Sequence, residues 1–244
     1  MKKTRFFALL LLLLSTIVFV QWKGIDDSRF VSLSINPSKQ QLAFYLKNEA
    51  GLHYNSIQNL KNGLARQHKT LIFATNGGMY MPDHSPQGLY IENGKLIKHL
   101  DTATSGYGNF YLKPNGVFYI NAKREASVCN TEDYTSTKQV MYATQSGPML
   151  VIDGAIHPAF KQGSTNLNIR NGVGILPNGD VLFAMSKTEI NFYDFANYFK
   201  QAGCNNALYL DGFVSRTYLP AKQWTQTDGN FGVLIGCTEM QKKK

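Results

Sequence analysis

Residues 191–212, NFYDFANYFKQAGCNNALYLDG, hold a helix signal followed at once by a strand signal, and this order indicates the fold class. Asn191 is a suitable N-cap, because its side chain can accept a hydrogen bond from a free helix amide, and Gly203 can end the helix in a left-handed conformation. The apolar run at 207–210 predicts a short buried strand that ends at Asp211. The side chains at helical spacing are Phe192, Phe195, Phe199 and Ala202.

The same order of elements occurs earlier in the chain. The pattern predicts a helix over 56–67 and an apolar strand over 71–75. If this strand and the later one are neighbours in a sheet, Asn76 and Asp211 lie at one sheet edge; the sequence leaves that neighbourhood open. The polar steps that end the two strands are Asn76-Gly77-Gly78 and Asp211-Gly212.

Antiparallel strands are predicted for most of the remaining chain. The segments 30–35 and 41–46 alternate or run apolar and flank NPSKQ, which predicts a hairpin. Four later turn dipeptides tolerate the left-handed backbone that tight hairpins require. The sequences around them form two similar pairs, which indicates either a duplicated double-hairpin unit or only the resemblance that all hairpins share. The dipeptides are Asn93-Gly94, Asn115-Gly116, Asp153-Gly154 and Asn178-Gly179; the similar runs are 87–97 with 146–156 and 110–120 with 174–184.

These patterns predict an α+β fold: a single domain over 25–240 with an extensive, mostly antiparallel sheet, hairpins and a few packed helices. Residues 1–24 have a different composition, in which basic residues flank a run of about 15 apolar residues. This is the usual length of the apolar region of an export signal, and it is shorter than a membrane-spanning helix requires. Because no small-residue cleavage site or lipobox cysteine follows, this segment is expected to be either a signal peptide or an N-terminal anchor that associates with the membrane. The domain is then exported, to a periplasmic or other extracytoplasmic site.

The net charge of +9 is a property of the chain ends. Seven of the 25 bases lie in the N-terminal segment and at 242–244, which leaves 18 bases against 16 acids. A nucleic-acid partner is therefore not expected, because such proteins group basic residues on the folded surface. Cys129, Cys204 and Cys237 allow one disulfide with one thiol left over, and form no C-x-x-C pair.

No metal or other cofactor is predicted. The five histidines are scattered singly, without metal-ligand spacing. Asp83, Asp133 and Asp153 are possible Ca²⁺ ligands, but they form no spaced carboxylate loop. The chain also lacks a G-x-x-x-x-G-K-[ST] loop, and Ser105 lacks the first glycine of a nucleophile elbow.

Asp211 is the leading candidate for catalysis. A carboxylate directly after four apolar residues tends to be partly desolvated, as nucleophiles and general bases often are; a plain Asp-Gly turn is the alternative. Arg170 presents a planar fork of donors that suits phosphate or carboxylate, although a surface ion pair explains it equally well. A pocket rich in amide side chains and glycines, with one carboxylate and one guanidinium, suits a polyhydroxylated, anionic ligand such as a sugar phosphate. The other residues expected there are Gln145, Ser146, Gly147, Asn171, Gly172 and Ser215, with Arg216 and Thr217 able to face the same space.

At these segments the sequence resembles the phosphodiester glycosidase family, from about residue 71 to 220. The motifs that carry the resemblance occur in order: TNGGMY at 75–80, IRNGVG at 169–174, and the helix–strand–Asp-Gly-x-x-Ser segment at 191–215. The resemblance implies that Asn76, Gly77, Gly78 and Gly212 line the pocket, where missing side chains let a sugar or phosphate lie against the main chain. A purely structural reason for the glycine pair is the alternative. Phe213-Val214 replaces the Gly-Gly of the animal member, so the family's substrate cannot be transferred.

The function implied is hydrolysis of a sugar–phosphate glycosidic diester. In this interpretation Arg170, aided by Asn76 and main-chain amides, holds the phosphate, and Asp211 attacks C1 or activates water. A phosphodiester leaves readily, so the second carboxylate of ordinary glycosidases is dispensable. The alternatives are a non-catalytic carbohydrate-binding protein of the cell envelope, a hydrolase of another envelope polymer, and a purely structural envelope protein.

Overall fold

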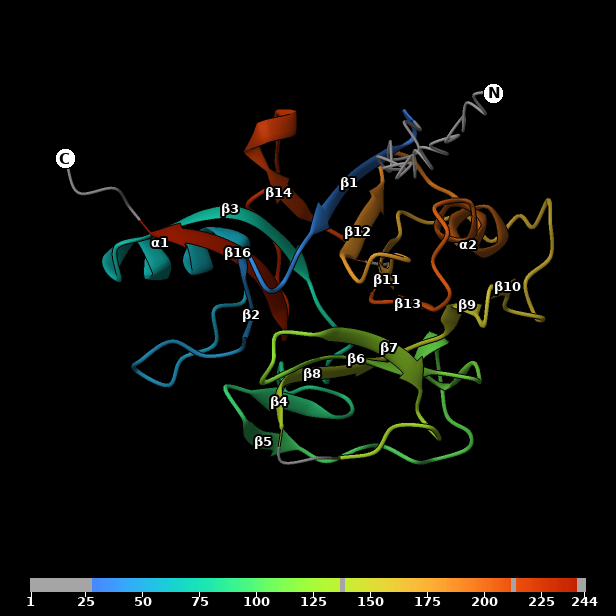
Figure 1. The fold of residues 1–244 in the computed structure, drawn as a ribbon, viewed down its shortest axis with the longest axis horizontal. Coiled ribbons are helices and arrows are strands. Elements are labelled where there is room, and N and C mark those ends of the chain that lie inside the picture. The colour runs from blue at the N-terminus through green and yellow to red at the C-terminus, as the bar shows by residue number, and fades with distance from the viewer. Residues whose placement is uncertain (1–27, 137–138, 212–213, 241–244) are drawn as a thin grey trace, which may run out of the picture.

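The computed structural model describes residues 28–136, 139–211 and 214–240 (Figure 1). Its described part contains two α-helices, α1 (Ile57–Arg66) and α2 (Phe192–Gln201), and three sheets whose strand pairs are all antiparallel. The predicted antiparallel architecture with few helices is confirmed, but the strands divide among three sheets instead of one extensive sheet. The predicted export segment, 1–24, lies outside the described residues.

Each sheet combines strands that are distant in the sequence. The six-stranded sheet has the order β1 (Phe30–Ile35), β12 (Val181–Ser186), β11 (Asn171–Ile175), β13 (Ala207–Tyr209), β9 (Met149–Ile152), β10 (Ala155–Ile156). The β3 sheet has the order β15 (Trp224–Thr225), β14 (Thr217–Leu219), β3 (Lys69–Asn76), β16 (Leu234–Met240), β2 (Gln41–Tyr45). The β8 sheet has the order β5 (Lys95–Lys98), β4 (Tyr90–Glu92), β8 (Val140–Ser146), β6 (Gly116–Asn121), β7 (Ala126–Asn130). Two 3-10 turns, Asn109–Tyr111 and Pro220–Lys222, complete the elements.

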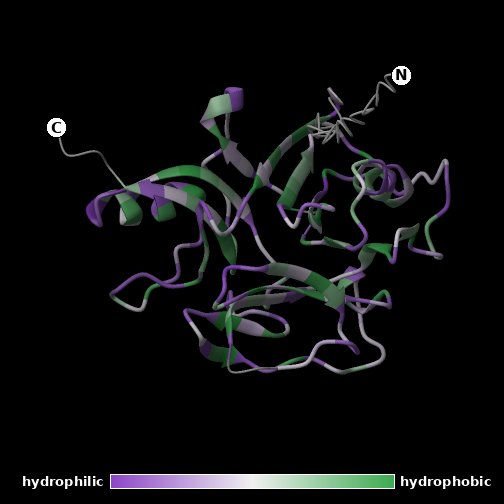
Figure 2. Cartoon of the chain, in the orientation of Figure 1, coloured by the Kyte–Doolittle hydropathy of each residue, from purple (hydrophilic) through white to green (hydrophobic). Residues whose placement is uncertain are grey.

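One hydrophobic core joins the three sheets. Phe183 of the six-stranded sheet lies 5.0 Å from Phe73 of the β3 sheet and 5.9 Å from Phe118 of the β8 sheet, measured between ring centroids. Phe44 extends the contact, 5.4 Å from Phe118. Each of these rings is at most 2% exposed, so burial of apolar area holds the sheets together. Figure 2 shows hydrophobic residues gathered on the strands and hydrophilic residues along the surrounding loops.

The helix signals of the sequence are confirmed, caps included. The Asn191 side chain accepts a hydrogen bond from the Asp194 amide at 2.8 Å, and Gly203 has a φ of +84° just beyond the end of α2. The aromatic face of α2 packs on the six-stranded sheet, where Phe195 and Phe199 are fully buried. Helix α1 is capped by Ser56 and covers the β3 sheet.

The hairpin predicted over 30–46 is wrong. Both strands exist, but β1 pairs with β12 and β2 pairs with β16. The connecting segment is held by Arg124, whose guanidinium donates to the Pro37 and Gln40 carbonyls at 2.9 Å each. This anchor, contributed from the turn after β6, directs the chain from one sheet to the next.

Three of the four turn dipeptides connect paired strands: Asn93-Gly94 joins β4 to β5, Asp153-Gly154 joins β9 to β10, and Asn178-Gly179 joins β11 to β12. Asn115-Gly116 does not, which removes the case for a duplicated double hairpin. Gly116 instead begins β6, where an added Cβ would come within 2.6 Å of the Cys129 carbonyl oxygen. Its glycine is required by close packing and not by a turn. Asn115-Gly116 therefore marks a tightly packed start of β6 and not a hairpin turn.

The disulfide that the sequence allowed is not formed. Cys129, Cys204 and Cys237 are all free, and burial raises the pKa of the Cys204 thiol to about 12. Neither described helix has the length and apolar character needed to cross a membrane.

Candidate active site at a junction of strand ends

Polar residues gather where strands of two sheets end. β3 ends at Asn76, β13 ends just before Asp211, and β11 begins at Asn171. The hypothesis that β3 and β13 are neighbours in one sheet is wrong, because they belong to different sheets. Asn76 and Asp211 do meet, however: the Asn76 side-chain amide donates to the Asp211 carbonyl at 3.2 Å. The junction therefore lies between sheets and not at the edge of one sheet.

Asn171 is at the centre of this junction, and its side chain is 1% exposed. Its Nδ2 donates to Thr75 Oγ1 at 3.0 Å, and to the main-chain and side-chain oxygens of Asn76 at 2.9 and 3.1 Å. Its Oδ1 accepts from the Asp211 amide at 3.0 Å and lies 3.2 Å from Ser215 Oγ. One buried amide thus connects the ends of β3 and β13 with the chain that follows β13.

Side chains also fix the main chain around Asp211. Ser215 Oγ donates to the Asp211 carbonyl at 2.6 Å, and Ser146 Oγ donates to the carbonyl of Leu210. Because the Asp211 amide already donates to Asn171, both main-chain polar groups of Asp211 are satisfied. The carboxylate therefore extends from a rigid point. Of the predicted site residues, Asn76, Ser146, Asn171, Asp211 and Ser215 are brought together here, whereas Gly212 lies outside the described residues.

Tyr80 belongs to the surroundings of the Asp211 carboxylate. Burial, and then the negative charge of Asp211, raise the pKa of the Tyr80 phenol. Its hydroxyl donates to the Asn230 carbonyl at 2.6 Å, and its ring stacks on His84 with centroids 5.6 Å apart. In the sequence, Tyr80 stands out only as the last residue of the TNGGMY motif, and it is not among the predicted site residues.

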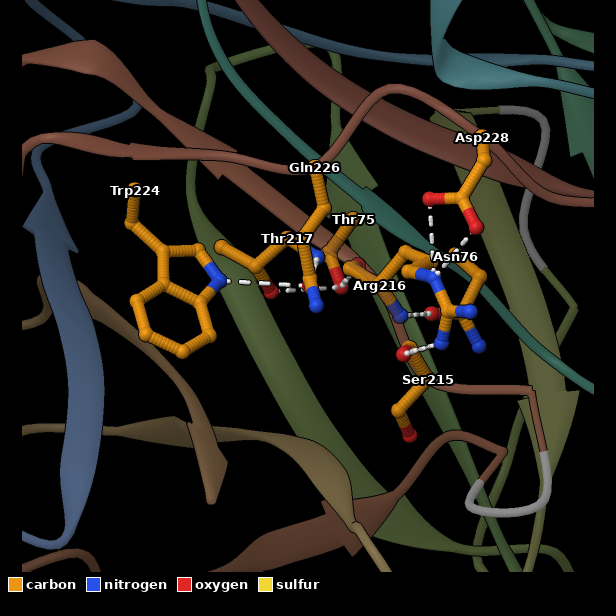
Figure 3. A network of polar contacts seen from close by, with 8 residues as sticks. All are labelled: Thr75, Asn76, Ser215, Arg216, Thr217, Trp224, Gln226 and Asp228. Carbon is orange, nitrogen blue, oxygen red and sulfur yellow. Dashed lines mark hydrogen bonds and ion pairs between the residues drawn. The ribbon is translucent and has the colours of Figure 1, made fainter. Parts of the chain in front are cut away.

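The segment after Ser215 binds the end of β3 through the contacts drawn in Figure 3. The Arg216 amide donates to Asn76 Oδ1 at 3.0 Å, and Thr75 Oγ1 donates to the Arg216 carbonyl at 3.0 Å. The Thr217 amide donates to Gln226 Oε1 at 3.1 Å. Arg216 and Thr217 thus reach the junction, as their position in the sequence allowed. Thr75 and Gln226 carried no signal, since an isolated Thr or Gln is common anywhere.

Close packing within the chain accounts for both glycines after Asn76. A Cβ added at Gly77 would lie 2.6 Å from a methyl carbon of Val233, and one added at Gly78 would lie 2.6 Å from the Gln145 carbonyl oxygen. Gly147 and Gly172 are similarly enclosed, by Asn115 and by the Leu208 carbonyl. Packing inside the protein is thus enough to explain why both positions are glycine. Approach of a ligand to this backbone stays a prediction.

Substitution at Gly78 tests this packing. Gly78→Ala should lower the free energy of unfolding by about 3 kcal/mol, because its methyl group would overlap main-chain atoms that cannot move aside. Gly163→Ala is the control: its Cβ meets nothing within 4 Å, so only its φ of +74° causes strain, about 1 kcal/mol. Urea unfolding of both variants measures the difference, and equal losses would contradict the packing explanation.

Gln145 points away from the junction. Its Oε1 accepts from the Leu89 and Asp101 amides at 3.0 and 2.9 Å, and its Nε2 donates to the Asp101 carbonyl and Thr131 Oγ1 at 2.8 and 3.1 Å. All four hydrogen-bonding positions of the amide are occupied by the protein. This geometry does not fit the predicted contact with substrate, and the cause is the alternation along β8, which sends Ser146 toward the junction and Gln145 away from it.

Arg170 is also enclosed, with a side chain that is fully buried. Nε donates to the Ile190 carbonyl at 2.8 Å and Nη2 donates to Asn166 at 2.9 and 3.0 Å, while Nη1 lies 3.4 Å from the Tyr209 hydroxyl. The guanidinium carbon stacks 3.6 Å from the centre of the Phe192 ring, and burial lowers the pKa of Arg170. The predicted direct grip on a phosphate does not fit these contacts, which connect α2 to the strand leading to Asp211.

Outside the junction, a metal-binding cluster or a cleft could also hold a ligand. The described residues contain no group of three or more His, Cys, Asp or Glu side chains arranged to hold a metal ion. A cleft of about 650 Å³ lies along β2 and is lined by residues that include Gln41, Lys47, Glu92 and Tyr142. None of the predicted site residues lines this cleft.

Comparison with known proteins connects this arrangement with one family. The family model described as phosphodiester glycosidase matches residues 69–233, which include Asn76, Asn171 and Asp211. The uncharacterized protein YigE of Escherichia coli (strain K12) is 36% identical to this chain over 187 residues, or 76% of this chain and 72% of that protein.

Solved structures share the fold at low sequence identity. The catalytic domain of zebrafish N-acetylglucosamine-1-phosphodiester α-N-acetylglucosaminidase, auto-inhibited by its pro-peptide, has a TM-score of 0.54 at 15% identity, covering 91% of this chain and 86% of that one. A Burkholderia pseudomallei K96243 protein named for its expected export has a TM-score of 0.56 at 11% identity, covering 85% and 73%. The family match and the identity to the Escherichia coli protein together establish that this chain belongs to the phosphodiester glycosidase family.

Proposed function

We propose that the protein hydrolyses a glycosyl 1-phosphodiester, cleaving the bond between sugar C1 and the phosphate oxygen. The observation that carries the proposal is the placement of Asp211 at the junction, where its amide and carbonyl are held by Asn171, Asn76 and Ser215. Membership of the phosphodiester glycosidase family and the fold shared with the zebrafish glycosidase support the choice of reaction.

Asp211 is the reacting group in this mechanism. Its carboxylate either attacks C1, displacing the phosphate monoester and forming a glycosyl ester that water then hydrolyses, or removes a proton from the water that attacks C1. The departing phosphate monoester is stable as an anion, so no second carboxyl group is needed to protonate it. The fixed main chain of Asp211 limits the positions that its carboxylate can take, and such preorganisation increases the rate.

The surrounding polar residues act through Asp211 in this proposal. The side chains of Asn76, Asn171 and Ser215 are engaged with the protein, so they position the carboxylate and do not grip the substrate. Arg170 has the same kind of role, because its guanidinium orders Tyr209, two residues before Asp211. This assignment replaces the expectation that Arg170 and Asn76 hold the phosphate.

We also propose that the reaction takes place outside the cytoplasmic membrane. The basic and apolar segment at 1–24 is the observation that supports export. Envelope or extracellular glycans that contain sugar–phosphate diesters are then the substrate class.

A product assay tests the function. The purified protein is incubated with a panel of glycosyl 1-phosphodiesters that differ in sugar and in the alcohol esterified to the phosphate. The expected products are free reducing sugar and a phosphate monoester in equal amounts. Binding of a glycan without product would support the carbohydrate-binding alternative, and release of sugar from polymers that lack phosphate would support another envelope hydrolase. Either outcome contradicts the proposal.

A further inference from the structure

An arginine other than Arg170 lies at the junction and is partly exposed. Arg216 follows Ser215 directly, and its side chain is 36% exposed. Its main chain is fixed on both sides, since its amide donates to Asn76 and its carbonyl accepts from Thr75. The partly exposed side chain of Arg216 thus starts from a main chain that is fixed beside the residues that hold Asp211.

The contacts of this guanidinium leave most of its donors available. Nε alone meets both carboxylate oxygens of Asp228, at 2.9 and 3.0 Å, and Nη1 donates to the Ser215 carbonyl at 3.0 Å (Figure 3). A guanidinium has five N–H donors, so three remain after these two are used. Within the described residues, Nη2 has no hydrogen-bond partner. Planar pairs of N–H groups of this kind suit two oxygens of a phosphate.

Charge accounting at the junction points the same way. A sugar–phosphate diester carries a negative charge, and the proposed reaction adds a second one as the phosphate monoester departs. Asp211 cannot compensate that charge, and Arg170 is fully buried against Phe192. Arg216 combines positive charge, exposure and a fixed main chain beside Asp211.

We propose that Arg216 binds the phosphate of the substrate through Nη1 and Nη2, and that Asp228 orients the guanidinium through Nε. This inference rests on the proposed function, since it assigns the phosphate-recognition residue of that site. Asp228 has a side chain that is 65% exposed, and its negative charge repels the bound phosphate. The two residues thus have opposite effects on affinity: Arg216 raises it, and Asp228 lowers it by partly neutralising the guanidinium.

The test measures binding without turnover, with N-acetylglucosamine 1-phosphate and inorganic phosphate as probes. Arg216→Gln should weaken binding of both by about 10- to 100-fold, as expected for loss of a charge-assisted pair of hydrogen bonds. Asp228→Asn should strengthen binding by roughly 3-fold, because it keeps the shape of the side chain and removes its charge. Binding of N-acetylglucosamine without phosphate should be equal in all variants. Thermal melting verifies that each variant is folded.

Arg66→Gln is the matched control, because it removes the same charge from the exposed end of α1. Equal weakening by Arg66→Gln and Arg216→Gln would overturn the proposal, since net charge alone would then explain the effect. Weakening by Asp228→Asn, or no binding of sugar phosphate by the unsubstituted protein, would overturn it as well.

Failure of this inference is distinguishable from failure of the proposed function. If the unsubstituted protein cleaves a glycosyl phosphodiester and Arg216→Gln has the same kcat and KM, the function stands and the role of Arg216 falls. If phosphate binding depends on Arg216 but no glycosyl phosphodiester is cleaved, the role of Arg216 as an anion-binding residue stands and the hydrolase falls.

Discussion

Asp211→Asn should reduce turnover of a glycosyl 1-phosphodiester by roughly 10³-fold or more, because the amide can neither attack C1 nor accept a proton from water. The stability of the protein should be nearly unchanged. The hydrogen bonds of Asp211 with Asn171, Asn76 and Ser215 use its main chain, which the substitution retains. Steady-state kinetics and thermal melting measure the two quantities.

The control for this prediction is Asp153→Asn, an identical chemical change at an exposed position in the turn between β9 and β10. It should alter neither activity nor melting temperature. Full activity in Asp211→Asn would exclude the residue as nucleophile and as general base.

Asn171→Leu should affect both activity and stability. Leucine fills a similar volume but leaves the Asn76 carbonyl and the Asp211 amide without their buried partner. Each unsatisfied group costs about 1–3 kcal/mol, so the free energy of unfolding should fall by about 4 kcal/mol. Activity of the remaining folded protein should fall roughly 10²-fold, because the main chain of Asp211 loses its anchor.

Asn168→Ala provides the comparison, since its half-buried side chain donates one solvent-exposed hydrogen bond, to Asn166. Its loss of stability should stay below about 1 kcal/mol. If Asn171→Leu keeps normal kcat and KM, the junction does not position Asp211, and the site must be assigned elsewhere.

Much of the fold could be predicted where the signals are local. The cap at Asn191, the left-handed Gly203 and the aromatic spacing between them predict α2 correctly, because each depends on residues within a few turns. Pairing partners could not be predicted. β1 and β2 are separated by a short turn, yet each pairs with a strand more than a hundred residues away in sequence. That choice is made by burial of the shared core around Phe183, which is a property of the whole chain.

The candidate site could be predicted as a set of segments but not as a set of contacts. Asn76, Asn171 and Asp211 do come together, although they come from different sheets. Arg170 and Gln145 each lie next to a residue that reaches the junction, but their own side chains point elsewhere. Neighbouring residues in extended chain face opposite sides, so one position decides whether a side chain reaches the junction. The sequence does not specify which side faces it.

The glycine pair shows a further limit of sequence reasoning. The missing side chains of Gly77 and Gly78 indicate that something lies close to this backbone, and within the chain Val233 and the main chain of β8 do so. A missing side chain marks a close approach but does not identify what approaches.

The most direct test of the central claim is to identify the bond that breaks. Hydrolysis is carried out in water enriched in oxygen-18, and the released phosphate monoester is analysed by mass spectrometry. The phosphate oxygens do not exchange with solvent under these conditions, unlike the anomeric oxygen of the free sugar. Cleavage at C1 leaves the phosphate without label, and this is the result we expect. Label in the phosphate monoester would mean attack at phosphorus and would contradict the role assigned to Asp211.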